Sequence, residues 1–104
     1  MSYPVNGLPP IHPGEMLGDE LAELGLSARA LADRLKVPHN RISSILAGTR
    51  SVSADTSLRL GRFFGMSDDF WLRLQTTYEI KKAKAEIGER VAADILPLRG
   101  NAAA

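Results

Sequence analysis

The stretch SARALADRLKVPHNRISSILAGTR, at residues 27–50, decides the fold. Apolar residues recur at helical spacing on both sides of the dipeptide Val37-Pro38. This dipeptide interrupts the first helix because the residue before a proline is pushed out of the α region. Ser27 is suited to the N-cap of the first helix, and Gly48 is suited to end the second. The stretch therefore predicts two short helices joined by a tight turn.

The spacing within this stretch is that of a helix-turn-helix motif. Ala32 falls where the two helices cross and only a small side chain fits, and Ile42 and Ile45 follow it by ten and thirteen residues. Lys36 occupies the turn position that glycine often fills. We therefore expect Lys36 to adopt a left-handed backbone conformation, at a cost of about 1 kcal/mol. The second helix, at 38–47, is then the recognition helix that enters the major groove of DNA.

Burial of its apolar side chains leaves the recognition helix with a polar outer face suited to reading base edges. Asn40 can form two hydrogen bonds with adenine, and serine hydroxyls can donate or accept. The predicted base contacts are His39, Asn40, Ser43 and Ser44. Guanidinium groups, hydroxyls and helix N-terminal amides around this helix are suited to hold phosphates. The predicted contacts to the DNA backbone are Arg29, Arg41, Thr49, Arg50 and Ser51.

The rest of the chain also predicts helices, because no segment before residue 79 alternates with the period of two that a strand requires. Residues that cap or terminate helices punctuate it. They are Pro13 and Gly25 before the motif, Ser53 and Gly65 after it, and Ser67, Asp68 and Asp69 at the start of a fifth helix. The sequence thus predicts an all-α fold of five helices.

The 104 residues are enough for one domain with a single modest core. Prolines predict an extended arm at 1–11, ahead of a helix-turn-helix domain at 12–78. Apolar residues three or four apart predict a C-terminal helical extension at 79–96, whose stripe needs a second surface to cover it. Gly88 argues against one continuous helix there, and a frayed tail is expected at 97–104.

The net charge of +1 conceals an uneven distribution. Residues 1–25 carry four acids and no Lys or Arg, whereas residues 26–50 carry five basic residues and the single acid Asp33. An acidic and a basic stretch can face different partners, or they can pair with each other.

The residue inventory excludes several classes of protein. There are no cysteines and only two histidines, so disulfides and thiolate catalysis are excluded and no metal site is expected. His12 is interpreted as a helix-entry residue beside Pro13 rather than as a ligand. No glycine-rich phosphate loop or paired-carboxylate frame indicates an enzyme or a cofactor. Without a membrane span or a targeting segment, we expect a cytoplasmic protein.

Several segments resemble the HigA/VapI-type antitoxins of the phage-repressor-like (XRE) helix-turn-helix family. They are IHPGEML at 11–17, VPHNRI at 37–42, LAGTRSVSADT at 46–56, LRLGRFFG at 58–65 and FWLRLQTTYEI at 70–80. The resemblance implies a phage-repressor-like fold. It also implies an antitoxin that neutralises a RelE-like toxin, a messenger-RNA endonuclease, and that represses its own operon as a homodimer. The operator is then an inverted repeat in double-stranded DNA.

Two further surfaces are expected on this interpretation. The predicted dimer interface comprises Phe70, Trp71, Leu74 and Tyr78, with the apolar stripe that follows them. The predicted contacts to a small basic toxin are the acids Glu15, Asp19, Glu20 and Glu23, because opposite charges favour association.

Two alternatives stay open. A stand-alone XRE-family repressor without a toxin partner would have the same DNA-binding residues. A protein-interaction module that has lost DNA binding would not depend on Asn40 or Arg41. A small basic protein encoded beside this gene would favour the antitoxin.

Overall fold

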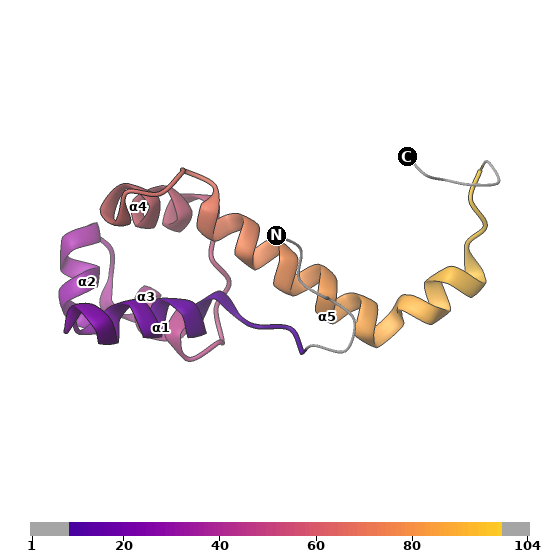
Figure 1. The fold of residues 1–104 in the computed structure, drawn as a ribbon, viewed down its shortest axis with the longest axis horizontal. Helices are drawn as coiled ribbons and strands as arrows, with labels where there is room; N and C mark the ends of the chain where they lie inside the picture. Colours follow the sequence, from indigo (N-terminus) through magenta and orange to yellow (C-terminus); the bar gives the residue numbers. More distant parts are fainter. Residues whose placement is uncertain (1–8, 99–104) are drawn as a thin grey trace.

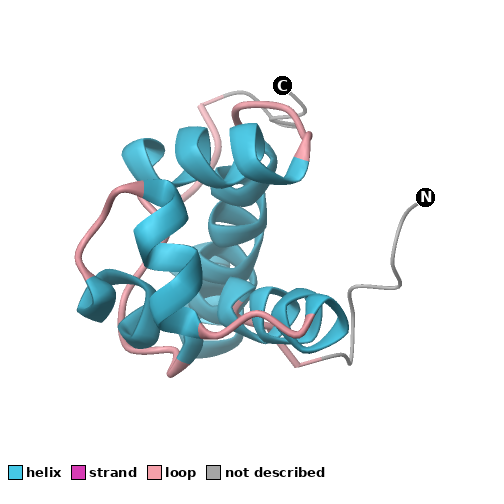
Figure 2. Ribbon diagram, turned by 90° about the vertical axis from the view of Figure 1, so that its left-hand side faces the viewer, coloured by secondary structure: helices cyan, strands magenta, loops and turns pink. Residues whose placement is uncertain are grey.

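The computed structural model describes residues 9–98, and this part of the chain contains five helices and no strand. The helices are α1 (Pro13–Leu24), α2 (Ala28–Leu35), α3 (His39–Leu46), α4 (Ala54–Phe64) and α5 (Phe70–Asp94). Helices α1 to α4 and the start of α5 gather into a bundle, and the rest of α5 projects from it (Figure 1). The end-on view in Figure 2 shows the helices of the bundle joined by short loops. The all-α prediction is confirmed, whereas most of the expected arm and tail lies outside the described residues.

The predicted capping residues set the helix boundaries. Ser27 and Ser53 each accept a hydrogen bond from the backbone amide three residues later, at 3.0 and 3.3 Å. Gly25 and Gly65 end α1 and α4 with φ angles of 67° and 73°, in the left-handed region.

His12 is the N-cap of α1. Its Nδ1 atom accepts a hydrogen bond of 2.9 Å from the amide of Gly14, and Pro13 occupies the first helical position. The ring of His12 also meets the ring of Tyr78 edge to face, with 5.0 Å between centroids. The interpretation of His12 as a helix-entry residue is confirmed.

The turn of the helix-turn-helix has the predicted left-handed residue. Lys36 has φ 63° and ψ 44°, and it is the only non-glycine residue with positive φ among those described. The amides of Lys36 and Val37 donate to carbonyls in the last turn of α2, at 3.3 and 3.0 Å. The Arg59 guanidinium donates to the carbonyl of Leu35 at 2.8 Å. These hydrogen bonds satisfy the end of α2 and offset the strain at Lys36.

The core forms where the five helices meet. Its fully buried side chains are Leu17, Leu31, Ala32, Ile42, Ile45, Leu60 and Trp71. Helix α1 begins so close to α3 that a Cβ atom at Gly14 would overlap the carbonyl oxygen of Ile45. A glycine is therefore required at this contact, which fixes the C-terminal half of α3 against α1.

The fifth helix begins later than predicted. Its first residue is Phe70, and Ser67 lies in the preceding turn, where its hydroxyl donates to the Asp69 carboxylate at 3.1 Å. Instead of a local cap, the buried hydroxyl of Ser57 on α4 accepts from the amide of Leu72 at 3.0 Å. It also donates to the carbonyl of Asp68 at 2.7 Å. Of the three residues predicted at the helix start, Asp69 is the N-cap residue, although its side chain makes no capping hydrogen bond. The expectation that Ser67 opens the helix is wrong, because the helix begins three residues later, where Ser57 of α4 supplies the hydrogen bonds.

Helix α5 is continuous through Gly88 to Asp94, so the expectation that Gly88 interrupts the helix is wrong. The extension expected at 79–96 is therefore the second half of α5, which begins inside the helix-turn-helix domain. None of the described helices is both long and apolar enough to cross a membrane.

Candidate nucleic-acid interface

Helix α3 presents its polar residues on the side opposite the core. Ile42 and Ile45 are completely buried. Asn40 is exposed, and no hydrogen bond engages its side-chain amide within residues 9–98. His39, Ser43 and Ser44 are half-buried on the same short helix. The four predicted base contacts are thus gathered on one element, with the Asn40 amide free to bind a base edge.

The loop after α3 carries three of the predicted backbone contacts. Gly48 has φ 80°, and the Thr49 hydroxyl donates to the carbonyl of Ser44 at 3.2 Å, which holds the loop to the end of α3. Arg50 is exposed and forms no ion pair within the described part of the chain. Ser51 donates to the carboxylate of Glu79 at 3.2 Å. Arg50 is therefore the side chain of this loop with an uncommitted positive charge.

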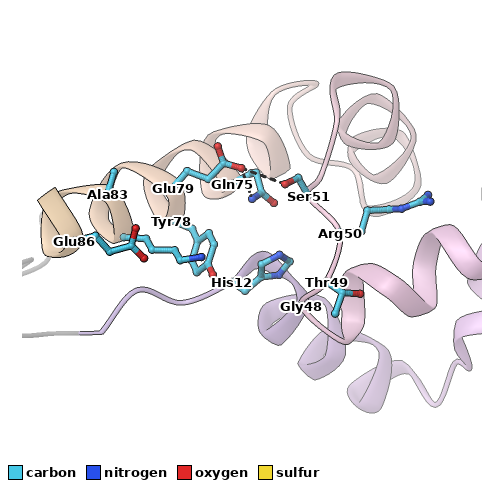
Figure 3. Close-up of a pocket in the computed structure, with 11 residues that line it drawn as sticks. His12, Gly48, Thr49, Arg50, Ser51, Gln75, Tyr78, Glu79, Ala83 and Glu86 are labelled. Carbon is cyan, nitrogen blue, oxygen red and sulfur yellow. Dashed lines mark hydrogen bonds between the residues drawn. The ribbon is translucent and has the colours of Figure 1, made fainter.

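An open pocket of about 330 Å³ lies between this loop, His12 and α5. Figure 3 shows Gln75, Tyr78 and Glu79 projecting from α5 toward the loop and His12. Arg50 points away from Glu79. The guanidinium of Arg50 is consequently directed outward, where a phosphate could reach it.

Arg41 is held by a charged cluster that joins α3 to α4. Its Nη1 atom lies 2.6 Å from Oδ1 of Asp55, and Nε of Arg59 lies 2.8 Å from the same oxygen. Hydrogen bonds from Arg59 and then Arg41 hold the pKa of the Asp55 carboxyl below its ordinary value of 3.8. The sequence predicts that Arg41 contacts phosphate, and the structure adds that Asp55 restrains the direction of its side chain.

The other predicted surfaces are more dispersed. Arg29 is exposed in the first turn of α2, on a different element from the loop at 49–51. Glu15, Asp19 and Glu23 are exposed on α1, and Glu20 is half-buried there.

The expected dimer residues do not all reach the surface. Trp71 is completely buried, with its ring 5.6 Å from that of Phe70 and 5.8 Å from that of Phe64. Phe70 and Leu74 are half-buried against the same core, and Tyr78 is half-buried against His12. The structure therefore removes Trp71 from the dimer interface expected from sequence, since it offers no surface to a second chain.

Three polar residues around the interface were missed from the sequence. They are Asp55, Gln75 and Glu79, which hold Arg41 and the loop after α3. Gln75 lies four residues after the buried Trp71, so its place on the inner face of α5 could have been found from helical periodicity. Asp55 and Glu79 each have one partner four residues away on the same helix, Arg59 and Gln75 respectively, which helical periodicity could also have found. Their contacts with Arg41 and Ser51 leave no such signal, because only the fold brings these residues close.

Two short helices crossing at a buried alanine, with a polar outer face on the second, define a helix-turn-helix protein. The family described as Helix-turn-helix (HTH_3) matches residues 18–71. The chain is 47% identical over 89 residues to virulence-associated protein I of Dichelobacter nodosus, covering 83% of this chain and 82% of that protein. The chain therefore belongs to the helix-turn-helix family, in its HigA/VapI-type branch.

Solved structures agree with this assignment. An addiction module antidote protein of the HigA family from Coxiella burnetii superposes with a TM-score of 0.84 at 47% identity, covering 86% of this chain and 99% of that one. The Pseudomonas aeruginosa antitoxin HigA, solved with the higBA promoter, superposes with a TM-score of 0.82 at 44% identity and the same coverage.

The Asp55 cluster predicts a pH-dependent contribution to stability. We expect Asp55→Asn to lower the melting temperature slightly at neutral pH, because both ion pairs are solvent-exposed and weak. The pKa of Asp55 is lowered in the folded state, so the stabilisation is complete above pH 3.8 and is lost as the pH falls through the lowered value. Thermal unfolding followed by circular dichroism over a pH series measures this difference.

The matched control for that series is Asp19→Asn, which removes an exposed carboxylate that forms no ion pair within residues 9–98. Asp19→Asn should not lower the melting temperature comparably at neutral pH. A difference between wild type and Asp55→Asn that is the same at pH 7 and at the acid end would contradict the role given to the cluster.

Proposed function

We propose that this protein is the antitoxin of a type II toxin–antitoxin pair, and that it acts by binding alone, without catalysis or a cofactor. It represses its own operon by binding an inverted-repeat operator as a homodimer. It also neutralises a small basic toxin of the RelE-like messenger-RNA endonuclease class. The observation that carries the proposal is the polar outer face of α3 beside the outward-directed Arg50.

The DNA-reading half divides into base contacts and phosphate contacts. On α3, Asn40 binds the edge of an adenine through its free amide, assisted by His39, Ser43 and Ser44. Arg50 holds a phosphate beside the recognition helix, together with Arg29 and Arg41. The other two residues predicted to contact phosphate, Thr49 and Ser51, instead position the loop, because their hydroxyls donate to the Ser44 carbonyl and the Glu79 carboxylate. The Pseudomonas aeruginosa relative solved with the higBA promoter supports DNA binding by this fold.

The two kinds of contact predict different effects on binding. We expect Asn40→Ala to weaken binding to the operator by about 1–3 kcal/mol and to change binding to random DNA little. Arg50→Ala should weaken binding to both duplexes and reduce the slope of log K against log salt by about 1. Fluorescence anisotropy titrations at several salt concentrations measure both quantities.

The control is Arg62→Ala, which removes the same charge from the exposed last turn of α4. It should leave the salt slope unchanged. The assignment of roles would be wrong if Arg50→Ala affected only the operator, or if Asn40→Ala weakened binding to random DNA equally.

The second half of α5 is the proposed dimer interface. Ile80, Ile87 and Val91 lie along one stripe and are 57%, 43% and 42% exposed, and no other described element covers them. Exposed apolar stripes on projecting helices are covered by association. A second copy of the same helix provides a matching stripe. The resulting pair presents two recognition helices for half-sites roughly 34 Å apart.

A charge placed on the stripe should separate the dimer. We expect Ile87→Asp to convert a dimer of wild-type protein to a monomer, because burying an unpaired carboxylate in an apolar interface is costly. Ala85→Asp adds the same charge to the opposite side of α5 and should remain dimeric. Size-exclusion chromatography with light scattering gives the masses. A monomeric wild type, or dimers of both variants, would overturn this interface.

The exposed acids of α1 are the proposed toxin surface. Glu15, Asp19 and Glu23 follow one another at intervals of four residues, which places them on one side of the helix. None forms an ion pair within residues 9–98. These carboxylates are therefore available to a basic partner.

Co-purification with the product of the adjacent reading frame tests the antitoxin half. We expect a variant with Glu15→Lys, Asp19→Lys and Glu23→Lys to lose the partner while it keeps operator binding. Asp33→Lys with Asp68→Lys, which reverses exposed acids elsewhere, should retain the partner. If wild type binds its operator but captures no neighbouring product, the protein is a stand-alone repressor.

A further inference from the structure

Two polar residues of α5, Gln75 and Glu79, hold the loop between α3 and α4. The Gln75 Oε1 atom accepts a hydrogen bond of 2.8 Å from the backbone amide of Val52. The Gln75 Nε2 atom donates to Oε2 of Glu79 at 2.9 Å, and this oxygen also accepts from the Ser51 hydroxyl at 3.2 Å. Two consecutive loop residues are thus attached to one face of α5. Figure 3 shows the contact between Ser51 and Glu79.

Within the described structure, no other acceptor replaces Gln75 in the hydrogen bond from the Val52 amide. Val52 is only 2% exposed, and no backbone carbonyl pairs with its amide. Gln75 itself is only 4% exposed, and both its side-chain oxygen and its side-chain nitrogen form hydrogen bonds within the protein. A buried amide left unpaired is costly, so removal of the Gln75 side-chain amide should shift the loop toward solvent.

We propose that Gln75 and Glu79 are positioning residues for the contact between this loop and the DNA backbone. Their hydrogen bonds fix Ser51 and Val52, and thereby set where Arg50 stands beside α3. This inference rests on the proposed DNA-binding function and deepens it, because it assigns the control of the phosphate contacts to a helix outside the helix-turn-helix motif.

The placement on α5 links the phosphate contacts to the proposed dimer. The same 25-residue helix carries Gln75 near its start and the exposed apolar stripe in its second half. When two copies pair through that stripe, each α5 holds its own loop by Gln75 and Glu79. The separation between the two phosphate-binding loops is therefore set by the pair of α5 helices.

The test uses Gln75→Met in the full-length protein, which keeps the volume of the side chain and removes both hydrogen bonds. We expect several-fold weaker binding to operator and random DNA alike. The slope of log K against log salt should fall by about 0.9 for each phosphate that the displaced loop no longer neutralises. The ratio of operator to random affinity should change little, because Asn40 is not touched. Ser57→Ala is the matched control.

Ser57 is as deeply buried as Gln75, and its hydroxyl also makes two hydrogen bonds, but both join α4 to the start of α5 and neither reaches residues 49–52. Ser57→Ala should lower the melting temperature and leave the salt slope at the wild-type value. Titrations are made at a temperature where circular dichroism shows every variant folded. A wild-type slope for Gln75→Met, or an equal fall for Ser57→Ala, would overturn the proposal.

A second pair of variants at the exposed Glu79 keeps the test decisive if Gln75→Met does not fold. Glu79→Gln and Glu79→Leu both remove the negative charge, but only glutamine can still accept the hydrogen bond from Ser51. The slope of log K against log salt should be smaller in magnitude for Glu79→Leu than for Glu79→Gln. Equal slopes would overturn the proposal. If wild type binds neither duplex, the proposed function fails and this inference with it. If wild type binds DNA and the variants keep the wild-type salt slope, only the inference is overturned and the proposed function stands.

Discussion

The structure depends on the burial of Ile42 and Ile45, which fixes the orientation of a helix too short to be stable alone. Helix α3 has only eight residues, fewer than an isolated helix needs in water. Both isoleucines are completely buried, and the close contact at Gly14 leaves α3 no room to shift toward α1. Because the inner face is fixed, the outer face is fixed as well. The exposure of the Asn40 amide is a consequence of core packing.

Helix α5 is the second organising element, and it combines three roles along its length. Trp71 closes the core of the bundle, Gln75 and Glu79 attach the loop after α3, and the exposed stripe offers a surface for a second copy. A helix with one apolar face would serve only the first role. The polar pair in its middle allows the same rigid element to connect the core with the proposed phosphate contacts.

Much of the fold could be predicted from the sequence, because its signals are local. The caps at Ser27 and Ser53 and the left-handed turn at Lys36 each depend on neighbours within a few positions. The small residue at Ala32 follows from its fixed spacing to Ile42 and Ile45 within the motif. The way α5 is capped could not be predicted, because the hydroxyl that accepts from the Leu72 amide belongs to Ser57, fifteen residues earlier. Arg41 and Asp55 are fourteen residues apart and Val52 and Gln75 twenty-three, and polar pairs at such separations leave no periodic pattern.

Trp71 shows a different limit of sequence analysis. Periodicity places it on an apolar face of α5, but an aromatic residue on such a face serves equally in a core or in an interface between chains. The packing of Phe64 and Phe70 around its ring decides for the core. Periodicity also predicts the apolar stripe in the second half of α5. No other helix within residues 9–98 covers this stripe, so it is exposed to solvent.

The most direct test of sequence-specific DNA binding is fluorescence anisotropy of the wild-type protein with its own upstream DNA and with a scrambled duplex. Measurements at about 50 and 200 mM salt separate phosphate contacts from base contacts, because the former weaken steeply over this range. The arrangement of α3 and the loop after it predicts selective binding to the upstream DNA that persists at the higher salt. Equal and weak binding to both duplexes would contradict the assignment of α3 as a recognition helix.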